Sequence, residues 1–320
     1  MKITFLGTAA AEGYPDPFCS CDNCEAARRI GGRALRKRAS VLIDDIFLID
    51  FGPDLLSASQ IHSIPLTRVE YAIQTHPHDD HFFVDNFIAR TDHCKVEGAP
   101  HLQYAVSPVV ARLMKEFGAR SFTSDDDLGR NHFPSFKLDL IVQDDWETVE
   151  LGPYTALAIP ATHAPGLQAR ILAIRHEDGS SFLYGTDTAP MPDGVWERVA
   201  QEGWVFDLLI MDHTHGTASH SATHHSSASM LREIEIMRRV GVANDVTRVI
   251  AHHLAHHSNP FPDEFDRFAN ERGYDVAWDG MVVEVLAGSP QRFGHASQSA
   301  ATVLVPSSRS RLPSAPASSR

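Results

Sequence analysis

The densest group of potential metal ligands in the sequence is the six-residue segment His76-Pro77-His78-Asp79-Asp80-His81. Its pattern, His-x-His-x-Asp-His, offers three imidazoles and one carboxylate, which suit zinc, manganese or iron. One loop rarely supplies so many ligands to a single ion, and His76 and His78 point to the same side if the chain there is extended. The segment therefore predicts two metal ions side by side rather than a chance cluster in a chain with 19 histidines.

The residues around this metal loop predict how it is held. Residues 70–74 read as a short buried strand that runs into the loop, and residues 82–89 have helical spacing after it. Residues 39–43 and 46–49 predict a hairpin that leads to Asp50-Phe51-Gly52. Further strands are expected at residues 2–6, 101–106, 136–142, 155–160, 170–175, 181–184, 205–211 and 246–251, and helices at 108–117 and 226–240.

Three of the four cysteines stand together as Cys19-Ser20-Cys21-Asp22-Asn23-Cys24. Three neighbouring cysteines leave one unpaired, and nothing indicates export, so a disulfide framework is not expected. Structural zinc prefers four ligands and accepts a Cys3His set. We therefore expect a thiolate cluster whose fourth ligand comes from elsewhere, and we expect Cys94 to be an ordinary half-buried thiol.

Composition limits the classes of partner. A chain of 320 residues with 43% hydrophobic content can bury a substantial core, and we expect one main domain. Its formal charge of -13 argues against extended nucleic-acid binding. No apolar run is long enough to span a bilayer and no secretory signal is recognised, so a cytoplasmic enzyme is expected. The basic run from Arg28 to Arg38 is interpreted as a solvated helix face rather than a substrate contact.

The strand that ends in Thr75-His76-x-His78-x-Asp80-His81 resembles the signature of the metallo-beta-lactamase superfamily of binuclear metallohydrolases. The resemblance implies an α/β fold, a four-layer αββα sandwich of two mixed sheets flanked by helices. It also implies that Asp50 supports the loop histidines from behind, since a ligand histidine generally donates its other ring N–H to such a partner. Capping of a helix near Pro53 is an alternative role for Asp50.

The order of motifs narrows the resemblance. Six motifs follow one another along the chain. They are a Cys-x-Cys-x-x-Cys run, the metal loop, a lone His163 after a strand, Thr186-Asp187-Thr188, a late His-x-x-His and Asp279-Gly280-Met281. From Met1 to about Ala287, this order is similar to the PhnP-like cyclic phosphodiesterases of the carbon-phosphorus lyase pathway. The chain departs from that family by carrying four late histidines instead of two isolated ones, so the register could be one residue out; they are His252, His253, His256 and His257.

The resemblance implies a role for each candidate. His76, His78 and His163 would bind one divalent metal, zinc or manganese, and Asp80, His81 and His253 a second, with Asp187 shared. One structural zinc would be held by Cys19, Cys21, Cys24 and His256. All of these candidates lie in one expected domain, residues 1–288. His224 is a candidate from its position instead, two residues before the Ser that should start a helix, where it is expected to protonate the leaving oxygen or steady the phosphate. The expected catalytic residues are then Asp80, Asp187 and His224. Other histidines receive no role: His213, His215, His220, His225, His252 and His257.

Two adjacent metals can hold a bridging hydroxide and clamp the oxygens of a phosphate ester during in-line attack. The expected reaction is therefore hydrolysis of a small phosphodiester, such as a cyclic ribose phosphate. Similar ligands serve other reactions, so a transfer-RNA 3'-end nuclease and a thioester or lactone hydrolase remain alternatives. So do a relative of the pyrroloquinoline quinone biosynthesis proteins and a non-catalytic metal-binding protein. A homodimer is compatible with the sequence, and residues 289–320, which lack acidic residues, are predicted to be a disordered tail.

Overall fold

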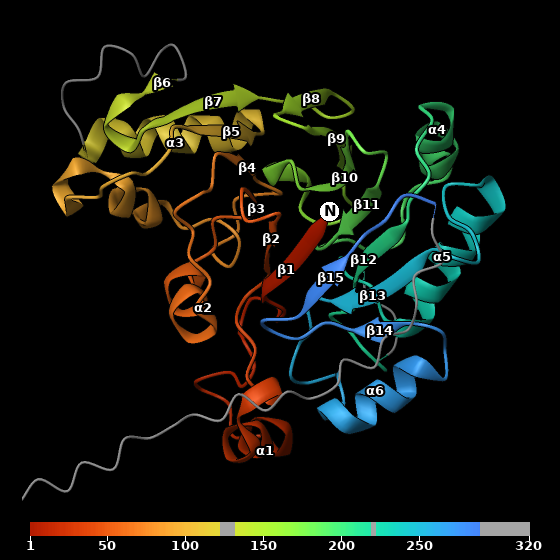
Figure 1. Cartoon of the computed structure of the whole chain (residues 1–320). Coiled ribbons are helices and arrows are strands. Elements are labelled where there is room, and N and C mark those ends of the chain that lie inside the picture. The colour runs from red at the N-terminus through yellow and green to blue at the C-terminus, as the bar shows by residue number, and fades with distance from the viewer. Residues whose placement is uncertain (122–131, 219–221, 289–320) are drawn as a thin grey trace, which may run out of the picture.

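The structure, a computed structural model, describes residues 1–121, 132–218 and 222–288, and the predicted tail at 289–320 lies outside them. Two mixed β-sheets lie at its centre (Figure 1). The first sheet runs parallel through its middle and antiparallel at both edges. In spatial order its strands are β15 (Val282–Glu284), β1 (Lys2–Gly7), β2 (Ser40–Ile43), β3 (Phe47–Ile49), β4 (Tyr71–Ile73), β5 (Leu102–Val106), β7 (Leu138–Val142) and β6 (His132–Phe133).

The second sheet is parallel in one half and antiparallel in the other. Its strands, in spatial order, are β14 (Asp275–Val276), β13 (Arg248–His252), β12 (Leu208–Asp212), β11 (Ser181–Gly185), β10 (Arg170–His176), β9 (Tyr154–Pro160) and β8 (Thr148–Leu151). Strands β9, β11, β12 and β13 all run in one direction, so their carboxyl ends meet at a single edge of this sheet.

Helices cover both outer faces. The α-helices are α1 (Asp22–Ile30), α2 (Leu55–His62), α3 (Pro108–Ser121), α4 (Val195–Gln201), α5 (Ser227–Val240) and α6 (Pro262–Asn270). Short 3-10 helices are η1 (Gly32–Ala34), η2 (Val84–Arg90), η3 (Asp92–Cys94), η5 (Pro134–Phe136) and η6 (Pro165–Leu167). In Figure 1, α2 and α3 flank the first sheet, α4, α5 and α6 flank the second, and α1 lies apart at the base. No helix among the described residues is long and apolar enough to cross a membrane.

Three buried apolar layers hold these elements together. Phe5 of the first sheet and Leu172 of the second belong to the layer between the sheets. Met114 of α3 belongs to the layer outside the first sheet, and Trp196 of α4 and Met237 of α5 to the layer outside the second. Burial of apolar surface in three layers is what a four-layer sandwich requires. The predicted αββα architecture is therefore confirmed.

The predicted hairpin is present and explains how the first sheet begins. β2 and β3 pair antiparallel, and Asp44 and Asp45 between them have φ values of 49° and 65°. Two consecutive left-handed residues make the turn that matches the right-handed twist of a hairpin, and aspartate tolerates that conformation better than most residues. The hairpin delivers Asp50 directly behind the metal loop.

Several local predictions were wrong. Residues 82–89 do not form an α-helix, because only the tighter 3-10 helix η2 follows the metal loop. Phe136, expected to begin a strand, instead ends η5, which starts at a proline whose fixed φ suits a helical turn, and the strand β7 begins at Leu138. The sequence reading also missed α4, α6, β8, β14 and β15. Cys94 is exposed rather than half-buried.

The basic run is not a uniformly solvated face. Arg36 is buried, and its guanidinium donates to Thr8 Oγ1 at 3.0 Å and to the carbonyl oxygen of Ala277. Arg38 makes a two-pronged ion pair with Asp54, with Nε to Oδ2 and Nη2 to Oδ1 both 2.8 Å. A buried arginine is tolerated where carbonyl and hydroxyl oxygens satisfy its donors, and such partners are not visible in a sequence.

Candidate metal centre

The first cluster of donor atoms joins the metal loop to the end of β9. His76 Nε2 lies 2.8 Å from His78 Nδ1, and His163 Nε2 lies 3.1 Å from the same atom. His163 comes three residues after β9 ends at Pro160, and its Nδ1 lies 3.1 Å from the carbonyl oxygen of Thr223. The three nitrogens all lie within 4.8 Å of one another, close enough to share one ion.

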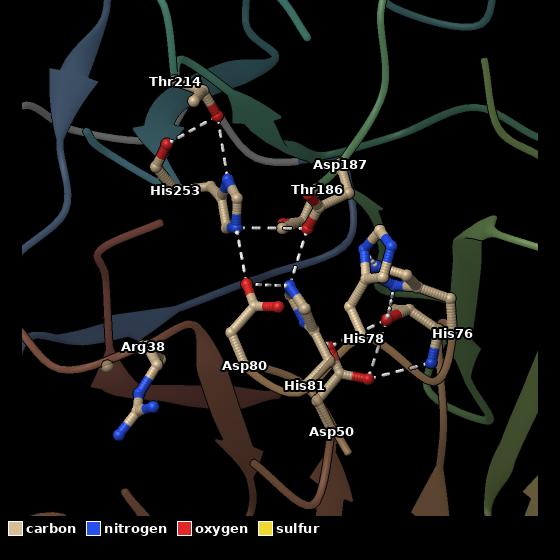
Figure 2. A network of polar contacts seen from close by, with 12 residues as sticks. Arg38, Asp50, His76, His78, Asp80, His81, Thr186, Asp187, Thr214 and His253 are labelled. Atoms are coloured by element: carbon tan, nitrogen blue, oxygen red, sulfur yellow. Dashed lines mark hydrogen bonds and ion pairs between the residues drawn. The ribbon is translucent and has the colours of Figure 1, made fainter. Parts of the chain in front are cut away.

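The second cluster gathers two imidazoles and two carboxylates (Figure 2). His81 Nε2 lies 3.0 Å from Asp80 Oδ2 and 2.7 Å from Asp187 Oδ2. His253 Nε2 approaches the same two carboxylate oxygens, at 3.4 Å and 3.2 Å respectively. Asp187 follows β11 and His253 follows β13, so the parallel strands of the second sheet carry these two side chains to the metal loop.

Asp187 lies between the two clusters. Its Oδ1 is 3.7 Å from His163 Nε2, whereas its Oδ2 faces His81 and His253. His81 Nε2 and Asp187 Oδ2 are both buried, and neither makes a hydrogen bond of acceptable geometry. Buried polar atoms normally have partners. Donor atoms around zinc lie roughly 3.3–3.8 Å apart, given bonds of about 2.0–2.3 Å, so the residues present fit a pair of divalent cations.

The electrostatic balance also favours cations here. Burial disfavours the imidazolium of His81, yet the surrounding carboxylates of Asp80, Asp187 and Asp50 outweigh it and raise the pKa well above its usual value. Burial acts in the same direction on His253, and Asp187 again outweighs it, so that this pKa is also raised. Both shifts report a negative potential that would attract metal ions.

Three site residues that follow strands have unusual backbone conformations. Asp50, Asp187 and His253 have φ values of 68°, 55° and 57°. Each lies just after a strand, β3, β11 or β13. Non-glycine residues seldom adopt positive φ, and such strain persists only where the surrounding structure imposes it. The layered core therefore turns these side chains sharply toward one point.

Asp50 supports the metal loop as expected. Its carboxylate is completely buried, with Oδ2 2.8 Å from His81 Nδ1, and it accepts hydrogen bonds from the backbone N–H and the hydroxyl of Thr75. Because His81 Nδ1 faces Asp50, its Nε2 is the nitrogen free to face the second cluster. The alternative role of Asp50 in capping is wrong, because α2 begins after Asp54 and no side chain makes a cap hydrogen bond there.

Gln74 was missed by sequence reasoning. Its side-chain NH2 donates to the carbonyl oxygens of His76 and His81 and to Asp50 Oδ1 at 2.9–3.0 Å. Its Oε1 accepts from the Tyr104 hydroxyl at 2.6 Å. One amide thus holds both ends of the metal loop. A glutamine at the end of an otherwise apolar strand was the available signal, because a buried amide needs several partners.

Asp212, at the end of β12, was also missed as a site residue. It is fully buried, and its Oδ2 lies 2.9 Å from His224 Nδ1 and 3.7 Å from His253 Nδ1. His224 Nδ1 is 3.7 Å from Asp187 Oδ1, so the expected catalytic histidine does lie beside the clusters. Burial lowers the pKa of His224, but Asp212 and Asp187 outweigh it and raise that pKa to about 9.

The cysteines form a separate cluster with one late histidine. The sulfurs of Cys19, Cys21 and Cys24 and a ring nitrogen of His256 all lie within 4.8 Å of one another. Cys21 Sγ is 3.5 Å from His256 Nδ1, and Asn23 donates to the carbonyl oxygen of His256 at 2.7 Å. Three sulfurs and one nitrogen are a familiar donor set for structural zinc.

The late histidines lie in different surroundings. His253 joins the second cluster and His256 the cysteines. His252 is buried, with Nε2 3.0 Å from the carbonyl oxygen of Gly7, and so lies in neither cluster. Among the other surplus residues, His213 contacts Asn259 and Tyr274, and His225 contacts Ser229. His213, His225 and His252 are therefore internal packing residues. His220 lies outside the described residues.

Comparisons with known proteins bear on the family and on the fold. The model of the beta-lactamase superfamily domain matches residues 46–300. Coenzyme PQQ synthesis protein B from Azoarcus sp. (strain BH72) is 24% identical over 322 residues, covering 89% of this chain and all of the relative.

Two solved structures share the fold. A diphosphatase of the PhnP family superimposes with a TM-score of 0.66 at 20% identity, covering 89% of this chain and 98% of the other. Zinc-bound PqqB from Methylobacterium extorquens superimposes with a TM-score of 0.62 at 17% identity, covering 89% and 100%. At these identities the likeness establishes the fold and leaves the reaction open.

Proposed function

The chain belongs to the beta-lactamase superfamily, and from that premise we propose that it is a metal-dependent hydrolase that cleaves a small phosphodiester with two divalent cations. The observation that carries the proposal is the position of Asp187. One carboxylate oxygen faces His163 and the other faces His81 and His253. A side chain shared by two donor sets supports two neighbouring ions better than one.

Each proposed ion has its own donor set. His76, His78 and His163 would hold one ion, and Asp80, His81 and His253 the other, with one oxygen of Asp187 for each. When bound, such a pair supplies Lewis-acid activation of water and of the ester oxygens. Cys19, Cys21, Cys24 and His256 would hold a third ion, zinc, with a structural role.

His224 is the proposed proton donor to the leaving oxygen. Its ring lies beside Asp187, and its side chain retains 16% of its accessible surface, so substrate can reach it. Asp212 holds the Nδ1 side of the ring at 2.9 Å and raises the pKa against burial, which keeps a proton available near neutral pH. Asp212 is therefore a proposed positioning residue, since it acts through His224.

A small ester is favoured over a long nucleic acid. The chain carries a formal charge of -13, and two arginines of its basic run, Arg36 and Arg38, are engaged by internal oxygens and by Asp54. Binding along a phosphate backbone relies on free lysines and arginines. The PhnP-family relative is a diphosphatase, which also favours a small phosphate compound such as a cyclic ribose phosphate.

Metal analysis combined with a substrate panel tests the proposal. Purified protein loaded with zinc or manganese should contain three ions per chain and hydrolyse cyclic or linear phosphodiesters better than thioesters, lactones or precursor transfer RNA. Asp187→Asn should abolish this turnover. Preferred cleavage of any of those other ester classes would contradict the phosphodiester assignment, and retention of turnover by Asp187→Asn would contradict the shared carboxylate.

A second candidate is a role like that of coenzyme PQQ synthesis protein B. It is favoured by the full-length similarity to the Azoarcus protein, which extends over 89% of this chain. The same metal content without hydrolysis of any ester in the panel would favour this candidate over the first. Complementation of a strain that lacks the PQQ synthesis protein would then support it directly.

A further inference from the structure

A cavity of about 250 Å³ opens on the outer side of the second sheet. It is bounded by α5, by the start of β13 and by the segment that joins α6 to β14, elements that lie together on one side of the molecule in Figure 1. Val249 lines the cavity near the beginning of β13, whereas His253 follows the end of that strand, and four extended residues span about 13 Å. The cavity is therefore separate from the candidate metal centre, and its volume suits one small molecule.

The floor of the cavity is apolar. Ile234 of α5 and Val249 of β13 are buried, and Leu231 of α5 is half-buried. Tyr274 also lines the cavity, but its hydroxyl is already engaged, 3.0 Å from His213 Nε2. Removing an apolar group from water against such side chains is favourable. The floor therefore suits a ligand with an aliphatic side chain.

Three charged side chains line the exposed rim of the same cavity. Glu235 and Arg238 belong to α5, and Arg272 follows α6. Glu235 and Arg238 come four and seven residues after Leu231, a spacing that places all three side chains on one face of a helix. One carboxylate and two guanidinium groups therefore surround the apolar floor.

The charged groups of the rim are available to a ligand. Among the residues that the structure describes, neither Glu235 nor Arg238 makes a hydrogen bond or an ion pair through its side chain. Arg272 is held in place, because its Nη1 donates to the carbonyl oxygen of Phe268 at 2.8 Å and its guanidinium stacks on the Phe268 ring at 3.7 Å. A guanidinium has five N–H donors, so others remain for a ligand.

The mixture of charges limits the chemistry of that ligand. A simple anion would meet the carboxylate of Glu235, and a simple cation would meet the guanidinium groups of Arg238 and Arg272. Like charges brought close together without a partner cost free energy. A small molecule that carries both charges beside an apolar group matches the rim and the floor together.

We propose that this cavity binds a free α-amino acid with an aliphatic side chain, at a site separate from the metal centre. The carboxylate of the amino acid accepts hydrogen bonds from Arg238 and Arg272, and its ammonium group donates to Glu235. Hydrogen bonds between guanidinium and carboxylate groups are among the strongest in proteins. The aliphatic side chain packs against Ile234 and Val249. This binding site goes beyond the proposed hydrolase function and does not depend on it.

Calorimetric titration of the metal-loaded full-length chain with four matched compounds tests the site. L-Leucine carries both charges, 4-methylpentanoate lacks the ammonium group, 3-methylbutylamine lacks the carboxylate, and glycine lacks the side chain. One L-leucine should bind per chain, and each other compound should bind at least about tenfold more weakly, because a hydrogen bond to a charged group or the burial of an apolar side chain is lost. Glycine also controls for chelation, since it binds metal ions through the same two groups as leucine.

Two variants that each neutralise one charge assign the contacts. Glu235→Gln should remove the preference for L-leucine over 4-methylpentanoate, and Arg238→Gln should weaken L-leucine binding at least about fivefold. Arg239→Gln is the matched control, since Arg239 is the next residue of α5, is also exposed and does not line the cavity. The control should keep the wild-type affinity.

Several results would overturn the site. Absence of saturable L-leucine binding up to about 10 mM would refute it outright. Equal binding of 4-methylpentanoate or 3-methylbutylamine would reduce it to a site for a single charge, and equal binding of glycine would indicate chelation at the metal centre. Unchanged L-leucine affinity in Arg238→Gln, or the same loss in Arg239→Gln, would place the ligand elsewhere. Because turnover is not measured, failure of the proposed function would leave this test unaffected.

Discussion

The two groups of potential metal ligands are built in different ways. In the proposed catalytic group, the metal loop meets side chains that follow β9, β11 and β13, and the buried layers of both sheets position them. In the cysteine group, three ligands come from one short loop at the start of α1 and only His256 comes from afar. Around α1 the apolar packing is a small cluster of Ala9, Tyr14, Ala27 and Ala34.

This difference predicts what each metal contributes. The fold already holds the catalytic donors through Asp50, Gln74 and Asp212, so metal there serves the reaction more than the folding. The region around α1 has little core of its own, so metal binding there should supply folding free energy directly. His253 and His256 lie three residues apart, and this one late loop connects the two groups.

Replacing Asp187 should have the largest effect on turnover. Asp187→Ala removes the carboxylate that faces both catalytic donor sets, so kcat/KM should fall about a thousandfold or more, equivalent to several kcal/mol of lost metal-assisted stabilisation. Metal analysis should find fewer catalytic ions and an unchanged ion at the cysteines. Equal loss of metal from both groups would show that they are not independent.

Replacing Asp212 should have the next largest effect. Asp212→Asn removes the charge that holds and polarises His224, so kcat should fall about a hundredfold. The Asp212 carboxylate favours the protonated ring, so its removal lowers the pKa of His224 from about 9, and activity should decline at a lower pH than in the wild type. Rate profiles against pH measure this shift.

Asp207→Asn is the matched control for Asp212→Asn. Asp207 directly precedes β12 at its opposite end, where it accepts a hydrogen bond from the Ser181 N–H. An unchanged profile in Asp212→Asn, or the same shift in Asp207→Asn, would remove His224 as the proton donor.

Asp50 should have a smaller effect that metal can reverse. Asp50→Asn weakens the support of His81, so the affinity of the second catalytic ion should fall about 10–100-fold. Titration of turnover with added zinc or manganese should show a higher requirement and recovery at saturation. Failure to recover in excess metal would mean that Asp50 acts on the reaction itself.

Cys21 should affect turnover least and stability most. Cys21→Ser removes one donor from the cysteine group, so zinc content should fall by one ion per chain and the region around α1 should lose protection first. Hydrogen exchange of residues 22–34 measures that loss, and turnover at low temperature should remain within about tenfold of wild type. A loss of activity as large as that of Asp187→Ala would contradict the separation of the two groups.

Local patterns in the sequence predicted much of this arrangement. The spacing within the metal loop, the three clustered cysteines and the apolar runs of the interior strands were each readable because they depend on neighbouring residues. The family resemblance added the pairing of distant ligands. Short elements such as β14 and β15 were not readable, because two or three residues become a strand only when a partner strand lies beside them.

The sequence alone determined which donor chemistry this protein possesses, since ligand types and local spacing are properties of the chain. Only the tertiary structure decided which of the late histidines meets which cluster. His252 and His253 are neighbours in the chain, yet the His252 side chain contacts the carbonyl oxygen of Gly7 and the His253 side chain joins the second cluster. It also revealed Gln74 and Asp212, whose importance lies in partners far along the chain. Burial and geometry across two packed sheets, rather than residue identity, give these side chains their roles.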